Sequence, residues 1–341
     1  MINSIRKYWK SGVVVLALGS VAWTMRHSGA DFRSLPRPSV AWLIAATAMF
    51  LVQYLIQAIG WHLLLRSLGQ AAPPRVTMRM WYMSLIARWM PGRVWYTASR
   101  LVLARQNGLS VTAVTFAVVM ELVYILVGGV IVTLSFAGAM FHGLLADPHG
   151  RLGLALTTAA VFVCAALVIN PANLLRLYDV KFLRKTIRKV AGEDLDSGGM
   201  PVLTTSSSLL LLVYFTGYWL YSGLMFGVLA HAFVPMSAAR WLACIPAFPC
   251  SWLIGFFSII TPAGLGAREG SMWLMLHGTF GGAQAGVLAI SSRLMMMAVE
   301  LISVGIASVV LRPGTPRVVP MAEPANGALR SEPDAKALST V

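Results

Sequence analysis

The chain has 341 residues, of which 57% are hydrophobic and 11% are charged. Soluble domains carry about 25% charged residues, so this composition excludes an ordinary soluble globular protein and indicates an all-α polytopic membrane protein. The net charge of +15 does not indicate a nucleic-acid partner. The basic residues flank apolar runs, a distribution that the positive-inside rule and attraction to anionic lipid headgroups explain.

Six apolar runs are long enough, or nearly so, to cross about 30 Å of hydrocarbon at 1.5 Å per helical residue. In chain order the predicted full spans are 12–25, 39–65, 111–139, 152–170, 204–233 and 284–311. The first run follows several basic residues, and no small-x-small cleavage site ends it. We therefore interpret it as a retained span rather than a signal peptide.

Two further regions are apolar but interrupted. The region 76–105 reaches Arg88 after a short apolar stretch, and we expect Pro246, Pro249 and Pro262 to break the region 240–282. Each region is either a helical hairpin that re-enters the membrane or a pair of broken spans. In both cases it adds an even number of crossings, so the orientation of the later helices is the same.

The distribution of Lys and Arg predicts the orientation. Basic residues concentrate near the N-terminus and in 66–105, 176–189 and the C-terminal tail, all of which fall on one side of the membrane. By the positive-inside rule that side is the cytoplasm. We expect a multi-pass protein of a bacterial cytoplasmic (inner) membrane with both termini cytoplasmic, a basic connector at 171–200 and a disordered tail at 312–341.

The two interrupted regions stand in equivalent places of an inverted repeat. With this orientation the half 204–311 repeats the half 39–139 upside down, within a single domain that covers residues 1–311. The spacing from proline to charged residue is also similar in the two halves, because Glu121 lies about 30 residues after Pro91 and Arg293 about 30 residues after Pro262. Inverted repeats with broken helices are common among proteins that alternate access across a bilayer. Chance similarity between two apolar helices is the other explanation.

Ionisable residues lie deep within two predicted spans. Glu121 and Arg293 are each about nine or ten residues into their spans, which places them roughly 13–15 Å deep, near the midplane. We expect them to approach each other or to share a polar cavity, with Glu269 and with Glu300 on nearly the same helix face as Arg293. The central polar path predicted here is therefore Glu121, Arg293, Glu269 and Glu300. An ion-pair network that only fixes the packing is the alternative.

The Pro-Gly breaks predict an anion site. A broken helix leaves backbone N–H groups free at the start of the next half-helix, and such ends bind anions. Arginines surround both breaks, and the planar guanidinium suits phosphate. The predicted binding set for a lipid headgroup phosphate is Arg93, Arg100, Arg268, Gly92, Gly264 and Gly266. The alternative, which we favour for Arg88, is an arginine that snorkels to the membrane surface.

Other motifs indicate no cofactor. The chain has no GxxxxGK[ST] loop, so we expect no ATP site of its own. Asp194 and Asp196 have the spacing of a metal-nucleotide pair, but they lie in a polar connector where solvated charge is the better interpretation. The three cysteines lie in apolar segments without CxxC spacing, and we expect packing residues rather than metal ligands.

Several of these motifs together carry a family resemblance. They are Trp61 and Gly69, Met90-Pro91-Gly92-Arg93-Val94-Trp95 with Arg100, Gly108-Leu109-Ser110 with Glu121-Leu122, and Thr261-Pro262-Ala263-Gly264-Leu265-Gly266-Ala267-Arg268-Glu269 with Arg293. Over about residues 10–311 the chain resembles the flippase-like membrane domain of lysylphosphatidylglycerol synthases and the stand-alone membrane proteins that share it. The resemblance implies a protein that moves a phospholipid or polyprenyl-linked lipid between leaflets. It does not imply synthase activity, because the aminoacyl-transferring soluble domain would need far more polar sequence than the connector and the tail supply.

The favoured hypothesis is therefore a flippase for an anionic lipid and not an enzyme, with the lipid and the bilayer as its partners. Two alternatives remain: a membrane anchor for a separate lipid-synthesising enzyme, and an embedded transferase that modifies lipid headgroups.

Overall fold

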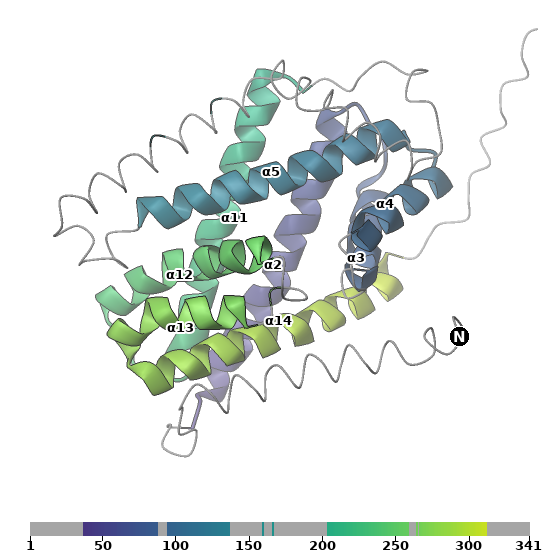
Figure 1. Cartoon of the computed structure of the whole chain (residues 1–341). Coiled ribbons are helices and arrows are strands. Elements are labelled where there is room, and N and C mark those ends of the chain that lie inside the picture. Colours follow the sequence, from purple (N-terminus) through teal and green to yellow (C-terminus); the bar gives the residue numbers. More distant parts are fainter. Residues whose placement is uncertain are drawn as a thin grey trace, which may run out of the picture.

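A computed structural model describes residues 37–87, 94–136, 203–258, 264 and 266–311, together with the isolated positions 159 and 166. The described segments form eight helices and no strand (Figure 1). The helices are α2 (Val40–Ser67), α3 (Pro74–Ala87), α4 (Val94–Gln106), α5 (Val111–Ser135), α11 (Thr205–His231), α12 (Ala238–Phe257), α13 (Ala267–Phe280) and α14 (Gly282–Val310).

Five of the described helices, namely α2, α5, α11, α12 and α14, are long and apolar enough to cross a membrane. Large apolar side chains point outward from them, such as Leu210 with 70% of its surface exposed and Leu301 with 68%. An outward apolar surface is stable only in lipid, so the all-α polytopic fold is confirmed. The predicted spans 12–25 and 152–170, the connector and the tail lie outside the described residues, apart from the two isolated positions.

Polar side chains start several of these helices. Ser110, Thr204 and Ser237 each accept a hydrogen bond from the backbone N–H three residues later, at 3.3, 3.2 and 3.4 Å. Such N-caps satisfy one of the N–H groups that a helix leaves free at its start. They fix where α5, α11 and α12 begin.

The expectation that Pro246 and Pro249 break the second interrupted region is wrong. Helix α12 runs through both prolines. Pro249 has no N–H for the carbonyl four residues earlier, that of Ile245. This carbonyl faces Gly223 of α11 so closely that a Cβ at Gly223 would lie 2.5 Å from its oxygen. Close packing of the neighbouring helix against the freed carbonyl explains why Pro249 is tolerated. The second break comes later, between α12 and α13.

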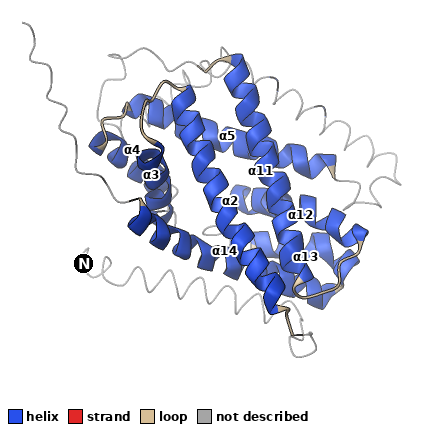
Figure 2. Ribbon diagram, turned by 180° about the vertical axis from the view of Figure 1, so that it is seen from behind, coloured by secondary structure: helices blue, strands red, loops and turns tan. Residues whose placement is uncertain are grey.

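The two halves have corresponding contacts. Helices α3 and α4 form one hairpin and α12 and α13 another, and the hairpins lie on opposite sides of the central pair α2 and α11 (Figures 1 and 2). If α2, α3, α4 and α5 are exchanged for α11, α12, α13 and α14, each helix contact has its counterpart. For example, α5 packs on α11 and α12, whereas α14 packs on α2 and α3. This is the arrangement expected of an inverted repeat.

The central pair is antiparallel. The N–H of Ser39 donates to the Ala232 carbonyl at 2.8 Å, at the start of α2 and the end of α11. Farther along α2, the Tyr221 hydroxyl donates to the Met49 carbonyl at 3.0 Å and the Tyr214 hydroxyl to the Ile56 carbonyl at 2.6 Å. Residue numbers rise along α2 while those of their partners fall along α11. An upside-down copy of the first half requires this antiparallel contact.

Gly223→Ala tests the packing of α11 on α12. The new methyl group would meet the Ile245 backbone, which cannot move as a side chain could, so we expect the variant to lose about 1–3 kcal/mol of stability. Gly217→Ala in the same helix is the control, because nothing lies within 4 Å of a Cβ there. Thermal unfolding of the purified protein in detergent compares them. Equal melting temperatures for the two variants would contradict the described contact.

Candidate functional site

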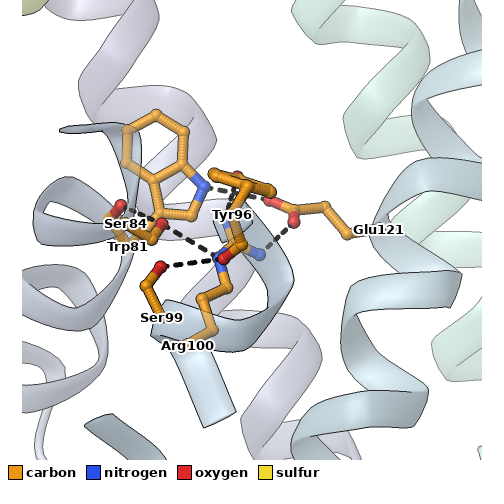
Figure 3. A network of polar contacts seen from close by, with 6 residues as sticks. All are labelled: Trp81, Ser84, Tyr96, Ser99, Arg100 and Glu121. Atoms are coloured by element: carbon orange, nitrogen blue, oxygen red, sulfur yellow. Dashed lines mark hydrogen bonds and ion pairs between the residues drawn. The ribbon is translucent and has the colours of Figure 1, made fainter. Parts of the chain in front are cut away.

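The first cluster of buried charges joins the first hairpin to α5. Arg100 of α4 has no exposed surface, and Glu121 of α5 is 4% exposed. The Arg100 guanidinium forms an ion pair with the Glu121 carboxylate and donates to the Tyr96 hydroxyl, while its Nε donates to Ser84 Oγ of α3 at 3.1 Å (Figure 3). Three helices therefore meet at one guanidinium.

Aromatic rings complete the first cluster. The Arg100 guanidinium lies 4.1 Å from the centre of the Trp61 ring of α2 and 4.3 Å from that of Tyr96. Trp81 Nε1 donates to the second Glu121 oxygen at 3.0 Å (Figure 3). Both carboxylate oxygens thus have a donor, and the cation has a carboxylate and two aromatic faces. A buried pair with such partners offsets its desolvation cost.

The second cluster lies at the start of α13, in the equivalent place of the second half. Arg268 and Glu269 belong to the first turn of α13, and Arg293 belongs to α14. All three are buried, and Arg293 Nε lies 3.8 Å from Glu269 Oε1. Glu269 Oε2 accepts the Gly266 N–H at 2.7 Å. The carboxylate therefore caps its own helix and faces a guanidinium of the next helix.

Arg268 is less completely bonded than Arg100. Its guanidinium lies 4.9 Å from the centre of the Phe248 ring of α12, and its Nη1 lies 3.2 Å from the Met296 sulfur. Within the described part of the chain, Arg268 Nη2 and Glu269 Oε1 are buried and have no hydrogen-bond partner. Arg293 and Glu269 both act electrostatically on the Arg268 guanidinium. Among the described residues, the second cluster thus brings the guanidiniums of Arg268 and Arg293 together with the Glu269 carboxylate.

Tyr54 of α2 links the two clusters. Its hydroxyl is 3.1 Å from Glu300 Oε2 and 3.3 Å from the Met296 carbonyl, both on α14, and its ring contacts the Trp81 ring with centroids 6.2 Å apart. Trp81 belongs to the first cluster, and Met296 contacts Arg268 of the second. Polar and aromatic groups therefore follow one another through the interior from Arg100 to Arg268.

Gln53 extends this polar interior between the central helices. Its side-chain nitrogen donates to the Tyr218 hydroxyl at 3.1 Å and to Ser222 Oγ at 2.8 Å, both on α11. Gln53, Tyr54 and Trp81 were not among the predicted site residues. A signal for Gln53 was present, because it is an amide in the middle of the apolar run 39–65. Nothing in the sequence distinguished Tyr54 or Trp81 from ordinary packing aromatics.

The structure places most of the predicted site residues in these clusters. Arg100 and Glu121, which we assigned to different sets, form one ion pair. Gly264 and Gly266 have φ angles of +70° and +82° at the turn before α13, a conformation that favours glycine. The Gly266 N–H, predicted to be free for an anion, donates to Glu269. Gly92 and Arg93 lie outside the described residues.

In both clusters the described contacts pair a guanidinium with a carboxylate. In the described part of the chain, no group of three or more His, Cys, Asp or Glu side chains could hold a metal ion. Buried guanidiniums bind carboxylates or phosphates strongly, because the alternative is an uncompensated charge.

The fold and the site define a polytopic helical membrane protein with ionised residues buried among its helices. Comparison with known families gives a match to the lysylphosphatidylglycerol synthase TM region over residues 11–303. The chain belongs to this family of transmembrane regions, and the resemblance that the sequence motifs carry is confirmed. No curated protein matches the chain in sequence.

The buried ion pair predicts a specific pattern of stability. Arg100→Gln or Glu121→Gln leaves one charge buried without its partner, which costs about 3–5 kcal/mol. The double variant Arg100→Met with Glu121→Leu removes both charges, so we expect it to lose much less stability than the two single variants together. Arg66→Gln in α2, at an exposed position, is the control and should change stability by less than about 0.5 kcal/mol. Additive losses, measured by unfolding in detergent, would contradict the pair.

Proposed function

We propose that the chain moves an anionic lipid between the two leaflets of a bacterial cytoplasmic membrane. The main support for this proposal is a series of polar and aromatic side chains that lie near one another through the interior of the helix bundle. The series runs from Arg100 and Glu121 through Tyr54 to Arg268 and Arg293. Ionisable groups at membrane depth are costly and usually line a path for a polar substrate. A headgroup that crosses the hydrocarbon needs such groups to replace its water.

The family supports the lipid part of the proposal, since its transmembrane region is associated with lipid handling. The charges support an anionic headgroup, because Arg268 and Arg293 are both buried in the second cluster and Arg268 Nη2 has no hydrogen-bond partner among the described residues. The inverted repeat supports alternating access, in which two similar halves open in turn to opposite sides. The sequence contains no nucleotide-binding loop, so movement follows the lipid gradient or is coupled to protons through a buried glutamate. The distribution of basic residues supports an orientation with both termini in the cytoplasm.

Lipid exchange in proteoliposomes tests the proposal. Vesicles carry fluorescent phosphatidylglycerol, and a membrane-impermeant reductant removes the signal of the outer leaflet. The protein should expose the inner-leaflet label faster than empty vesicles do. Arg268→Gln should slow exchange about tenfold or more, because a hydrogen bond to a charged group contributes about 1.5–3 kcal/mol.

The matched control is Arg240→Gln. Arg240 is at the start of α12, and its guanidinium donates to the Pro235 carbonyl at 2.7 Å, away from both clusters. Its replacement should leave exchange unchanged. Exchange no faster than in empty vesicles, for both phosphatidylglycerol and a polyprenyl phosphate, would reject the proposal.

A further inference from the structure

The second cluster is incompletely bonded, in contrast to the first. In the first cluster the carboxylate has a donor at each oxygen and the guanidinium contacts four side chains, those of Glu121, Ser84, Tyr96 and Trp61. In the second, Arg268 Nη2 and Glu269 Oε1 are buried without hydrogen-bond partners among the described residues. Unmade hydrogen bonds of buried charged groups are costly, and native structures rarely keep them without a functional reason.

Two like charges are also held near each other there. Arg268 and Arg293 are each 4% exposed, and Arg293 Nε lies 3.8 Å from Oε1 of Glu269, the residue next to Arg268. The Glu269 carboxylate makes two interactions. It caps α13 through Oε2 and faces Arg293 through Oε1. Glu300, the next carboxylate of the interior, accepts from the Tyr54 hydroxyl. An added oxyanion would relieve the repulsion and bond the free guanidinium nitrogen.

We propose that Arg268, Arg293 and the N-terminus of α13 form the oxyanion site of this chain, and that the Glu269 carboxylate occupies it when no ligand is bound. The ligand is a phosphate group, either that of a lipid headgroup or a free phosphate. Its oxygens replace the Glu269 carboxylate at the first N–H groups of the helix and also accept from Arg268 Nη2, and Glu269 moves away. This inference rests on the proposed function only where the phosphate belongs to a lipid headgroup.

The proposal that Glu269 competes with the ligand explains two features: the Gly266 N–H is capped, and Arg268 Nη2 lacks a hydrogen-bond partner among the described residues. The Glu269 carboxylate resembles a phosphate oxygen pair in charge and geometry, so it can accept the Gly266 N–H at the positive end of the helix. It is a monoanion on a short tether, however, and leaves Arg268 Nη2 unbonded. A phosphate has more acceptor oxygens and satisfies the second guanidinium as well. Arg100, whose three guanidinium nitrogens already donate to Ser84, Glu121 and Tyr96, takes no part in this site.

Stabilisation by ligand tests the site in the purified full-length protein. Inorganic phosphate is titrated into the protein in detergent against sodium chloride of equal ionic strength, and the melting temperature is recorded. Phosphate should raise the melting temperature of the wild type in a saturable way, as a ligand of the native state does. Arg268→Gln should abolish the effect, and Arg240→Gln should keep it. If Arg268→Gln does not fold, Arg268→Lys serves, and its phosphate affinity should fall because an ammonium lacks the planar fork.

The Glu269→Gln variant tests whether Glu269 competes with phosphate for the site or helps to bind it. The amide oxygen can still accept the Gly266 N–H, so the cap remains while the negative charge is lost. We expect half-maximal stabilisation at a phosphate concentration about tenfold lower than in the wild type. A lower affinity in this variant, or a phosphate effect equal to that of chloride in the wild type, would overturn the inference.

Nanodiscs distinguish the two sources of phosphate. Stabilisation by phosphatidylglycerol beyond that of phosphatidylcholine, lost in Arg268→Gln, indicates a lipid headgroup. Stabilisation by inorganic phosphate alone indicates a soluble anion, which supports the site. Phosphate binding without lipid exchange in proteoliposomes would reject the proposed function and leave the oxyanion site standing. Lipid exchange with no phosphate effect would reject the site alone.

Discussion

The structure depends on how ionised groups are held where water cannot reach them. A charge at the centre of a bilayer span costs roughly 2.5–3.5 kcal/mol on insertion scales, and more when it is isolated. Arg100 meets this constraint with a carboxylate, two hydroxyls and two aromatic rings from four helices. The pair can form only if the first hairpin packs against α2 and α5. One guanidinium therefore fixes the arrangement of the first half.

The second half repeats the design with the charges exchanged. In the first half the arginine is on the hairpin and the glutamate on the following helix, whereas Glu269 is on the second hairpin and Arg293 on the helix after it. The repeat thus preserves the place of an ion pair but not its polarity. Arg268 adds a further cation beside the second pair. The proposed function needs a half that exchanges partners with a substrate, and the incompletely bonded second cluster suits that role better than the fully bonded first one.

Much of this architecture follows from the sequence. Apolar runs predicted four described spans, because their length must match the hydrocarbon thickness. The same reasoning was wrong for Pro246 and Pro249, since whether a proline breaks a helix depends on the neighbour that meets the freed carbonyl, here Gly223. The charged residues could be predicted from their position deep within apolar runs. That position does not predict which residues they pair with. Arg100 was assigned to the headgroup-phosphate site because it lies near the Pro91-Gly92 break, although it is completely buried against Trp61 and pairs with Glu121.

The central claim is that the charged residues of the two halves lie in one polar interior, shielded from lipid. A side-chain-resolution cryo-EM map of the chain in a lipid nanodisc tests it most directly. The account predicts the Arg100 guanidinium against the Glu121 carboxylate, Arg268 and Arg293 around one shared position, and acyl-chain density only along the outer faces of α2, α11 and α14. Acyl chains in contact with Glu121 or Arg293, with the two clusters on separate lipid-facing surfaces, would contradict it.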